Sequence, residues 1–167
     1  ANDRGVQNRL LRQCQMYIRA IIFFLCRRHP PRSTRKGSSA ASDVYKRQVI
    51  SRLERRGLKL VGIKLMQVDD ALARQHYGEH VDRPFFAGLV DFITSSPVVA
   101  MAWEADNAVE AVRNTMGQTN PTTSPLGTIR GDLALDIGRN LVHGSDSPES
   151  AVQELGLFFS AGELLDY

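Results

Sequence analysis

The chain has 167 residues, of which 43% are hydrophobic and 23% are charged, with 13 glycines and 7 prolines. This composition is typical of one globular domain with an additional segment, and it excludes a collagen-like chain, a disulfide scaffold and a fully disordered tail. The net charge of +3 is unevenly distributed, because residues 1–48 carry 11 of the 21 basic and 2 of the 18 acidic residues, a balance of +9, which leaves −6 for residues 49–167.

The first 48 residues form a basic leader that differs from the rest of the chain. Its apolar run from Met16 to Cys26 is interrupted by Arg19 and is shorter than the roughly 20 residues that cross a bilayer. The small-residue cleavage site of a secretory signal does not follow this run directly. Residues 27–48 have the composition of a disordered linker. We therefore predict no membrane segment. Binding to nucleic acid rests on charge alone and is disfavoured, since no aromatic residue is interleaved with the charges of residues 27–44.

From Val49 onward the pattern becomes regular. Three glycines mark predicted helix ends: Gly57 should end the first helix, Gly78 the second and Gly117 the fourth. The second helix should begin at Asp69 or Asp70, either of which can cap it. Apolar periodicity predicts the following elements in chain order: a helix from Val49, a strand at Leu58–Met66, a helix around Leu72, a helix with Pro84 in its first turn, a buried strand at Pro97–Trp103 and a helix at Ala108–Met116.

Residues 117–131 lack periodicity, and a loop of this length in a compact domain is usually functional or disordered. Residues 140–143 predict the last strand, and Asp146 with Glu149 predicts a capping box for a final helix that has Pro148 in its first turn. Alternating strands and helices indicate an α/β or α+β sandwich. The regular part begins with a helix, so a first strand is missing from the pattern.

One motif, His76-Tyr77-Gly78-Glu79-His80, matches the H-x-x-E-H pattern of a zinc protease. That chemistry needs both imidazoles on one continuous helix, which Gly78 and Pro84 interrupt, and no third ligand is evident. Residues 49–167 also contain no cysteine, because Cys14 and Cys26 both lie in the leader. We predict no protein-held metal.

A better constellation is His143-Gly144-Ser145-Asp146-Ser147 at a strand-to-helix turn, with the Glu154 carboxylate on the following helix. Arginine and hydroxyl side chains precede it, and these bind phosphate through charge-assisted hydrogen bonds: Arg113, Thr119 and Arg130, with Asn140 close by. A neutral imidazole held by a carboxylate can attack phosphorus. From spacing alone two interpretations remain open, phosphate chemistry and a histidine that is only well hydrogen-bonded.

This constellation resembles the signature of the nucleoside diphosphate kinases. The resemblance extends over residues 49–167 in the family's order and spacing, and it rests on Asp82-Arg83-Pro84-Phe85-Phe86, Pro97-Val98-Val99-Ala100-Met101, Gly117-Gln118-Thr119-Asn120-Pro121, Arg130-Gly131-Asp132, Gly138-Arg139-Asn140 and the run from His143 to Ser147.

The resemblance implies a ferredoxin-like βαββαβ α+β sandwich with helices on an antiparallel sheet. It implies a kinase that transfers the terminal phosphoryl group of a nucleoside triphosphate to a nucleoside diphosphate through a phosphohistidine on His143. Glu154 would orient the His143 ring, Ser145 would support Glu154, and Tyr77 would lie beside the transferred group. The nucleotide, with Mg²⁺ on its phosphates, would contact Arg113, Thr119, Arg130 and His80 through its phosphates, Phe85 and Ile137 through its base, and Asn140 through its sugar.

The chain departs from the family at its start. The family begins with a strand carrying a Lys-Pro-Asp-Gly-Val segment, and residues 1–48 contain no such motif. We therefore expect a fold that lacks the usual first strand, with residues 1–48 as a disordered or non-native leader and residues 49–167 as the kinase-like domain. The alternative is that Met16 to Leu25 supplies a replacement strand.

The same departure leaves a second function open, a catalytically impaired nucleotide-binding or regulatory relative. The resemblance further implies a homo-oligomer, either a hexamer or a tetramer. The cysteine-free domain and nucleotide substrates suit a cytoplasmic location.

Overall fold

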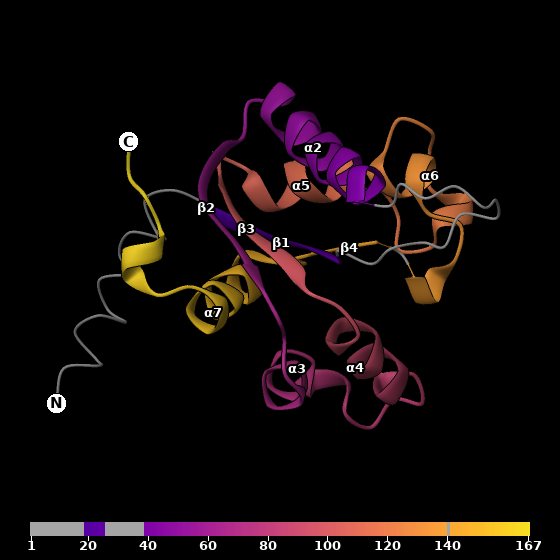
Figure 1. The fold of residues 1–167 in the computed structure, drawn as a ribbon. Helices are drawn as coiled ribbons and strands as arrows, with labels where there is room; N and C mark the ends of the chain where they lie inside the picture. Colours follow the sequence, from indigo (N-terminus) through magenta and orange to yellow (C-terminus); the bar gives the residue numbers. More distant parts are fainter. Residues whose placement is uncertain (1–18, 26–38, 140) are drawn as a thin grey trace, which may run out of the picture.

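The computed structural model describes residues 19–25, 39–139 and 141–167, which form a four-stranded sheet with helices on both faces (Figure 1). The strands are β1 (Arg19–Leu25), β2 (Lys59–Met66), β3 (Val98–Glu104) and β4 (Val142–Gly144). None of the helices in these ranges is long and apolar enough to cross a bilayer.

The sheet has the order β2-β3-β1-β4, and every neighbouring pair is antiparallel. β1 therefore lies inside the sheet, paired with β3 from Arg19↔Glu104 to Leu25↔Val98 and with β4 from Ile22↔Gly144 to Phe24↔Val142. This arrangement confirms the predicted α+β class with helices on an antiparallel sheet.

The expectation that the fold lacks its first strand is wrong. The apolar run of the leader supplies β1, as the replacement-strand alternative anticipated, and Ala20 to Phe23 are buried. Arg19, which interrupts the run, is itself buried in an ion pair with Glu104, Nη2 to Oε2 at 2.8 Å. A charge that looked incompatible with a central strand is therefore neutralised at the end of that strand.

The first helix also begins earlier than predicted. Helix α2 spans Ser39–Arg55, and Gly57 follows it with a φ of 84°, a conformation that glycine adopts without steric cost. The first half of α2 lies within residues 27–48, whose overall composition indicated a linker. The division of the chain at Gln48 into leader and domain stays a prediction, although β1 and the first turns of α2 precede that residue.

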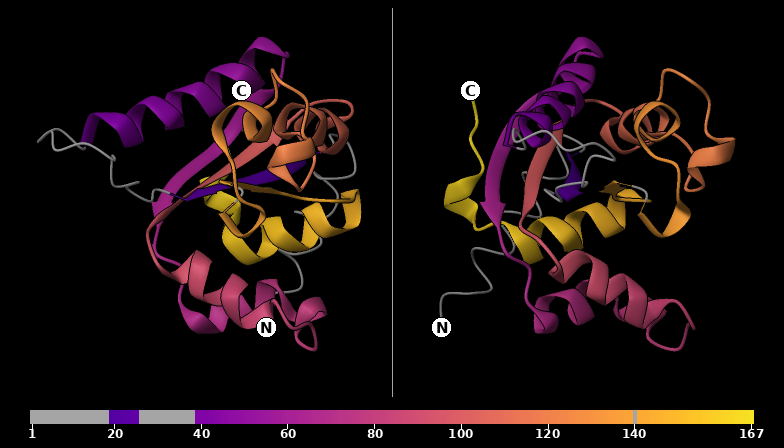
Figure 2. Two further views of the ribbon diagram at one scale, coloured as in Figure 1. Left: turned by 90° about the vertical axis from the view of Figure 1, so that its right-hand side faces the viewer. Right: turned by 45° about the vertical axis from the view of Figure 1, so that its right-hand side comes forward.

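Alternation along the strands separates two cores, one on each face of the sheet. Ala20 and Ile22 on β1 and Trp103 on β3 face one core, under α2 and α5 (Ala108–Met116). Ile21 and Phe23 face the other core, under α3 (Asp70–His76), α4 (Phe86–Thr94) and α7 (Pro148–Phe158). Figure 2 shows the two helical layers on opposite sides of the sheet. β3 is buried along its whole length, as its continuous apolar sequence predicts.

Most helix ends follow the predicted caps. Asp69 caps α3 by accepting from the Leu72 amide, and Gly117, with a φ of 87°, ends α5. Two details differ: the capping box of α7 is formed by Ser147 and Ser150, not by Asp146 and Glu149, and α4 begins at Phe86, two residues after Pro84. Short helical turns complete the described chain: η1 (Gly78–His80), η2 (Pro121–Thr123), α6 (Ile129–Leu133), η3 (Ile137–Arg139) and η4 (Ala161–Glu163).

Candidate active site

His143 lies at the centre of β4, directly opposite Phe23 of β1. Two residues before it, Leu141 has a φ of 69°, in the left-handed region that branched and bulky side chains rarely adopt. Strained backbone of this kind persists where the surrounding structure fixes it and is concentrated at functional sites. The His143 side chain is half-buried, with 32% of it exposed.

Glu154, on α7, accepts one hydrogen bond from the His143 ring and one from Ser145, which holds the carboxylate in place. His143 Nε2 lies 2.8 Å from Glu154 Oε1, and Ser145 Oγ donates to Glu154 Oε2 at 2.5 Å. Burial opposes the charge on Glu154, but the hydrogen bond from His143, the charge of that ring and the bond from Ser145 together lower the pKa of Glu154. An ionised carboxylate only accepts hydrogen bonds, so His143 Nε2 carries a proton, and in the neutral form of the ring the lone pair is on Nδ1.

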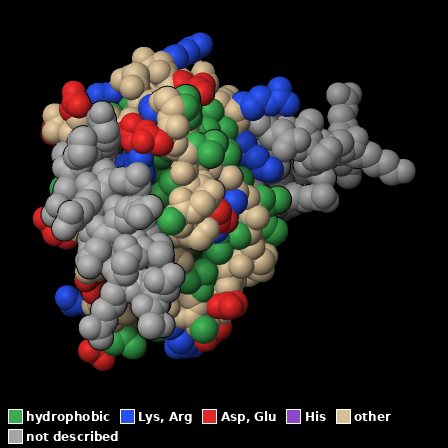
Figure 3. Space-filling model, turned by 90° about the vertical axis from the view of Figure 1, so that its left-hand side faces the viewer, with side chains coloured by type: hydrophobic (Ala, Val, Ile, Leu, Met, Phe, Trp, Pro, Cys, Tyr) green, Lys and Arg blue, Asp and Glu red, His purple; other side chains and the backbone are tan. Residues whose placement is uncertain are grey.

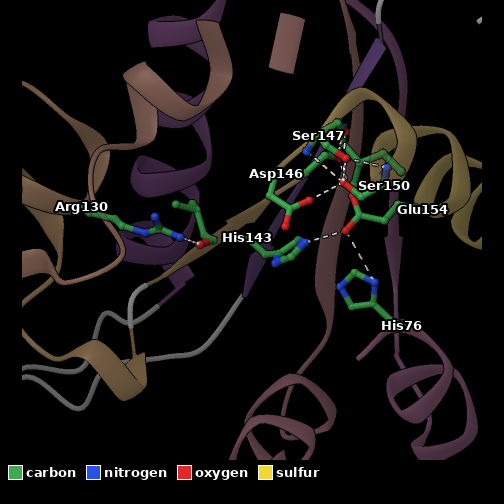
Figure 4. Close-up of polar contacts among 10 residues, drawn as sticks. His76, Arg130, His143, Asp146, Ser147, Ser150 and Glu154 are labelled. Carbon is green, nitrogen blue, oxygen red and sulfur yellow. Dashed lines mark hydrogen bonds and ion pairs between the residues drawn. The ribbon is translucent and has the colours of Figure 1, made fainter. Parts of the chain in front are cut away.

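Ser145 connects this pair to the inner strand of the sheet. Its hydroxyl accepts from the Ile21 amide at 3.3 Å while it donates to Glu154, and its own amide donates to the Ile21 carbonyl. Asp146 accepts a hydrogen bond from Ser150 at the start of α7 (Figure 4). That bond, with smaller effects from Arg113 and His143, lowers the pKa of Asp146.

Aromatic rings surround His143 on its buried side. Phe23 stacks on it with centroids 5.6 Å apart, and Tyr77 meets it edge-on at 5.9 Å. Tyr77 is buried, and burial followed by the charge of Glu154 raises the pKa of its hydroxyl. The structure therefore brings together the four predicted catalytic residues, His143, Glu154, Ser145 and Tyr77.

Two arginines supply positive charge near the site. Arg130 of α6 is buried and donates to the Gly117 and Val142 carbonyls at 3.0 and 2.8 Å, which ties the long loop to β4 one residue before His143. Burial, and then repulsion from Arg113, lowers the pKa of Arg130 to about 10. Arg113 is exposed on α5 and lines a hollow of about 400 Å³ with Asp146 and Pro148. Arg113 alone of the predicted nucleotide-binding residues lines that hollow.

The remaining predicted nucleotide-binding residues in the described ranges are Phe85, Ile137, His80 and Thr119. Phe85, at the start of α4, and Ile137, in η3, are 57% and 59% exposed, and α4 and η3 lie against each other. His80 lies beside Phe85 with ring centroids 5.8 Å apart. Thr119 is exposed in the loop after α5, and Asn140 lies outside the described residues.

One residue of the site was recognised in the sequence only as part of the rejected zinc motif. His76 ends α3, and its ring lies edge-on to His143 at 4.7 Å, with Nδ1 3.8 Å from Glu154 Oε1 (Figure 4). The signal that could have found it is its place three residues after buried Ala73 on the inner face of α3. His76 and His80 lie in different elements, α3 and η1, so the motif forms no continuous metal-binding helix.

The site offers few donors that suit a magnesium ion. In the described ranges, His76, His143 and Glu154 form a group whose ligand atoms lie within 4.8 Å of one another. Mg²⁺ prefers carboxylate, phosphate and water oxygens in octahedral geometry, and this group offers imidazoles and a carboxylate that already accepts two hydrogen bonds. These residues do not fit a resident Mg²⁺ ion.

Comparison with known proteins places this geometry in one family. The nucleoside diphosphate kinase family model matches residues 39–164. The chain is 61% identical over 120 residues to the nucleoside diphosphate kinase of Gloeobacter violaceus and 58% identical over 120 residues to that of Carboxydothermus hydrogenoformans, which in each case covers 72% of this chain and 80% of the relative.

A solved structure gives the same result in three dimensions. The nucleoside diphosphate kinase of Halobacterium salinarum, in complex with CDP, superposes with a TM-score of 0.77 at 41% identity, covering 89% of this chain and 91% of that one. The match with the family model begins at Ser39, the first residue of α2, and extends through the candidate nucleophile and its carboxylate. By sequence and by fold, this chain belongs to the nucleoside diphosphate kinase family.

Proposed function

We propose that the chain is an active nucleoside diphosphate kinase that works through a phosphohistidine on His143. The observation that carries the proposal is the pair His143–Glu154: the carboxylate holds the proton on Nε2 and leaves Nδ1 as the free nitrogen. In the first half-reaction, the Nδ1 lone pair attacks the terminal phosphorus of a nucleoside triphosphate, the P–N bond forms, and the bond to the bridging oxygen breaks and releases the diphosphate. In the second, a terminal oxygen of another diphosphate attacks the same phosphorus and the P–N bond breaks.

The protein contributes orientation and charge to this reaction. Phosphoryl transfer depends mainly on positioning and on stabilising the charge of the transferred group. Arg113 and Arg130 would supply the positive charge that balances it, and Thr119 and His80 would add phosphate contacts. Glu154 stabilises the positive charge that develops on the His143 ring. Lys59 and Lys64 pair with Glu104 and Glu163 on the β2 side of the sheet, so neither is placed to replace the lysine of the family motif.

The nucleotide base would lie between Phe85 and Ile137, and the sugar would contact Asn140. The exposure of Phe85 and Ile137 on adjacent elements supports this placement. Stacking on one aromatic face does not read the edge of a base, so such a site would accept many nucleotides.

Mg²⁺ would arrive with the nucleotide, bound to its phosphates, as part of the substrate. The cationic and imidazole character of the side chains around His143 supports this assignment over a protein-held ion. The ion would neutralise phosphate charge, and the residues of the chain hold and orient the complex.

The proposal also includes assembly of the chain into a homo-oligomer. β2 is an edge strand, and Ile63 and Leu65 on it are 51% and 64% exposed. Figure 3 views the side of the molecule on which β2 and the C-terminal end lie, and hydrophobic side chains are exposed there. An edge strand with exposed apolar side chains favours pairing with another copy of the chain. A hexamer or a tetramer in the cytoplasm is what the family membership leads us to expect.

The decisive experiment is a phosphoenzyme assay on the full chain with labelled Mg-ATP. We expect acid-labile label on the wild type, its transfer to an added nucleoside diphosphate, and no label on His143→Ala. If nucleotide binds but no label appears, the proposal is refuted in favour of the impaired nucleotide-binding relative. A His29→Ala variant, changed in the leader, serves as the matched histidine control and should label like the wild type.

A further inference from the structure

His76 is a buried histidine beside the site, and the proposed reaction does not use it. Its side chain is 2% exposed, whereas that of His143 is 32% exposed. Three aromatic rings contact it on the apolar side, Phe23 at 5.4 Å, Phe158 at 5.2 Å and Tyr77 at 4.3 Å between centroids. Its polar side faces His143 and Glu154.

The groups around His76 keep it uncharged. Burial lowers its pKa to about 4, with a further lowering from His143 on β4 and a small one from His80 in η1, against a raising effect of Glu154 on α7. A neutral imidazole carries one proton, on Nδ1 or on Nε2. The position of that proton decides what His76 presents to the site.

The surroundings select Nδ1. His76 Nδ1 lies 3.8 Å from Glu154 Oε1, the same oxygen that accepts from His143. His76 Nε2 is buried, and no hydrogen-bond partner for it exists among the described residues. A proton on Nε2 would bury an unused donor and turn the Nδ1 lone pair toward a carboxylate. A proton on Nδ1 turns an N–H dipole toward the negative charge and leaves only a lone pair unpaired.

We propose that His76 is a positioning residue, whose neutral imidazole directs its Nδ1–H at Glu154 Oε1 and keeps that oxygen aligned with His143 Nε2. The inference rests on the proposed function, because its consequence is that His143 Nδ1 stays free to accept the phosphoryl group. His76 acts on the nucleophile through Glu154 and does not touch the substrate.

The first test reads the protonation of both rings directly in the wild-type chain. Long-range ¹H–¹⁵N spectra of the ¹⁵N-labelled protein at pH 7.5 distinguish the two tautomers of each histidine. We expect the proton on Nδ1 of His76 and on Nε2 of His143. A proton on Nε2 of His76 would overturn the inference. This result does not depend on turnover, so it stands apart from any failure of the phosphoenzyme assay.

The second test uses two variants with opposite losses. His76→Phe keeps an aromatic ring in the cage and removes the donor, whereas His76→Asn keeps an amide N–H near the position of Nδ1 and loses ring volume. We expect His76→Asn to unfold at a lower temperature than His76→Phe. We also expect His143 to be phosphorylated more slowly in His76→Phe, by about 10-fold relative to His76→Asn, because the N–H dipole directed at Glu154 Oε1 is lost.

Comparing the two variants in thermal stability and in phosphorylation rate distinguishes a positioning role of His76 from a space-filling one. If the phosphorylation rate followed thermal stability, with His76→Phe the faster variant, His76 would only fill space and the inference would be wrong. Nucleotide affinity, measured by calorimetry, should change little in either variant, because the predicted base and phosphate contacts lie elsewhere. Gln75→Ala, exposed on the same helix, is the control and should match the wild type in rate and stability.

Discussion

Phe23 and His143 lie opposite each other in the antiparallel pair β1–β4, and their rings stack with 28° between the planes. Phe23 comes from the basic leader and His143 from the last strand, so two distant parts of the chain build the wall of the site together. Phe23 also packs on Phe158 at 4.1 Å, which ties it to the helix that carries Glu154. The leader strand therefore supports the candidate nucleophile directly.

Truncating this ring should cost both stability and activity. Phe23 is 3% exposed, and we expect Phe23→Ala to lower the free energy of unfolding by about 3–5 kcal/mol through the lost apolar contacts and the cavity left behind. Urea unfolding measures this change. Leu126→Ala, at a side chain that is 86% exposed, should change stability by less than about 0.5 kcal/mol. Equal effects in the two variants would contradict the buried position of β1.

The charge of Glu154 should matter more than its shape. Glu154→Gln keeps the size of the side chain but removes the negative charge that fixes the Nε2 proton of His143 and stabilises the ring as it becomes positive. We expect the rate of phosphoenzyme formation to fall by about 100-fold, within the range typical of a lost acid–base partner. Rapid-quench measurements check this rate. Glu149→Gln, exposed on the same helix, should keep the wild-type rate.

Ser145 should contribute mainly to stability. Ser145→Ala removes the donor to Glu154 Oε2 and the acceptor of the Ile21 amide, both in a buried position. Leaving buried polar groups unpaired costs about 1–3 kcal/mol, and we expect a loss of this size in chemical unfolding. Ser95→Ala removes a hydrogen bond at an exposed residue and should cost clearly less. A larger loss at Ser95 would argue against the inner position of Ser145.

The free energy of unfolding should decrease as the pH is lowered, because His76 is neutral in the folded chain. Its pKa is lowered to about 4 in the folded chain, against about 6.5 when unfolded, so the unfolded state binds the proton first as the pH falls. The contribution of His76 to stability is complete above about pH 6.5 and is lost between about pH 6.5 and 4, a change on the order of 3 kcal/mol. Unfolding free energies from pH 7.5 to 4.5 should therefore decline more steeply for the wild type than for His76→Phe. Parallel curves would contradict a neutral His76.

Gly117 should tolerate no side chain. Its φ is 87°, and a Cβ there would lie 2.0 Å from Ser124 Oγ and 2.5 Å from Thr128 Oγ1. Gly127 has nearly the same φ, 89°, but a Cβ there would meet no atom within 4 Å. Gly127→Ala should therefore cost only the backbone strain, about 1–2 kcal/mol, and Gly117→Ala should cost measurably more. Thermal unfolding of both variants checks the difference, and equal midpoints would show that the loop yields freely.

The sequence predicted the elements whose apolar pattern is strong. β3 and α5 lie within one residue of their predicted bounds, because continuous burial and a helical stripe leave little ambiguity. The first half of α2 was missed because it lies within residues 27–48, whose overall composition is typical of a linker. β1 was predicted only as an alternative, because Arg19 interrupts its apolar run. The ion pair with Glu104, which comes from a distant part of the chain, explains how that charge is accommodated.

The site divides in the same way. His143, Glu154 and Ser145 are close in sequence, in a turn and the helix after it, so their spacing already indicated contact. His76 and Phe23 approach them from 67 and 120 positions away, and spacing along a chain carries no information about such contacts. The hydrogen-bonded roles of Arg130 were also hidden, because it donates to backbone carbonyls, which every residue possesses.

The inner position of β1 also affects how the chain is completed during synthesis. β1 is made early, yet its partners β3 and β4 end at Glu104 and Gly144. At about 5–20 residues per second, roughly 80 further residues take several seconds to reach β3, and β4 follows later still. Throughout that interval Ile21 and Phe23 have no sheet to join. A ribosome-bound fragment ending before Glu104 would expose this apolar strand to chaperones, and release of the last strand and helix would then complete the site.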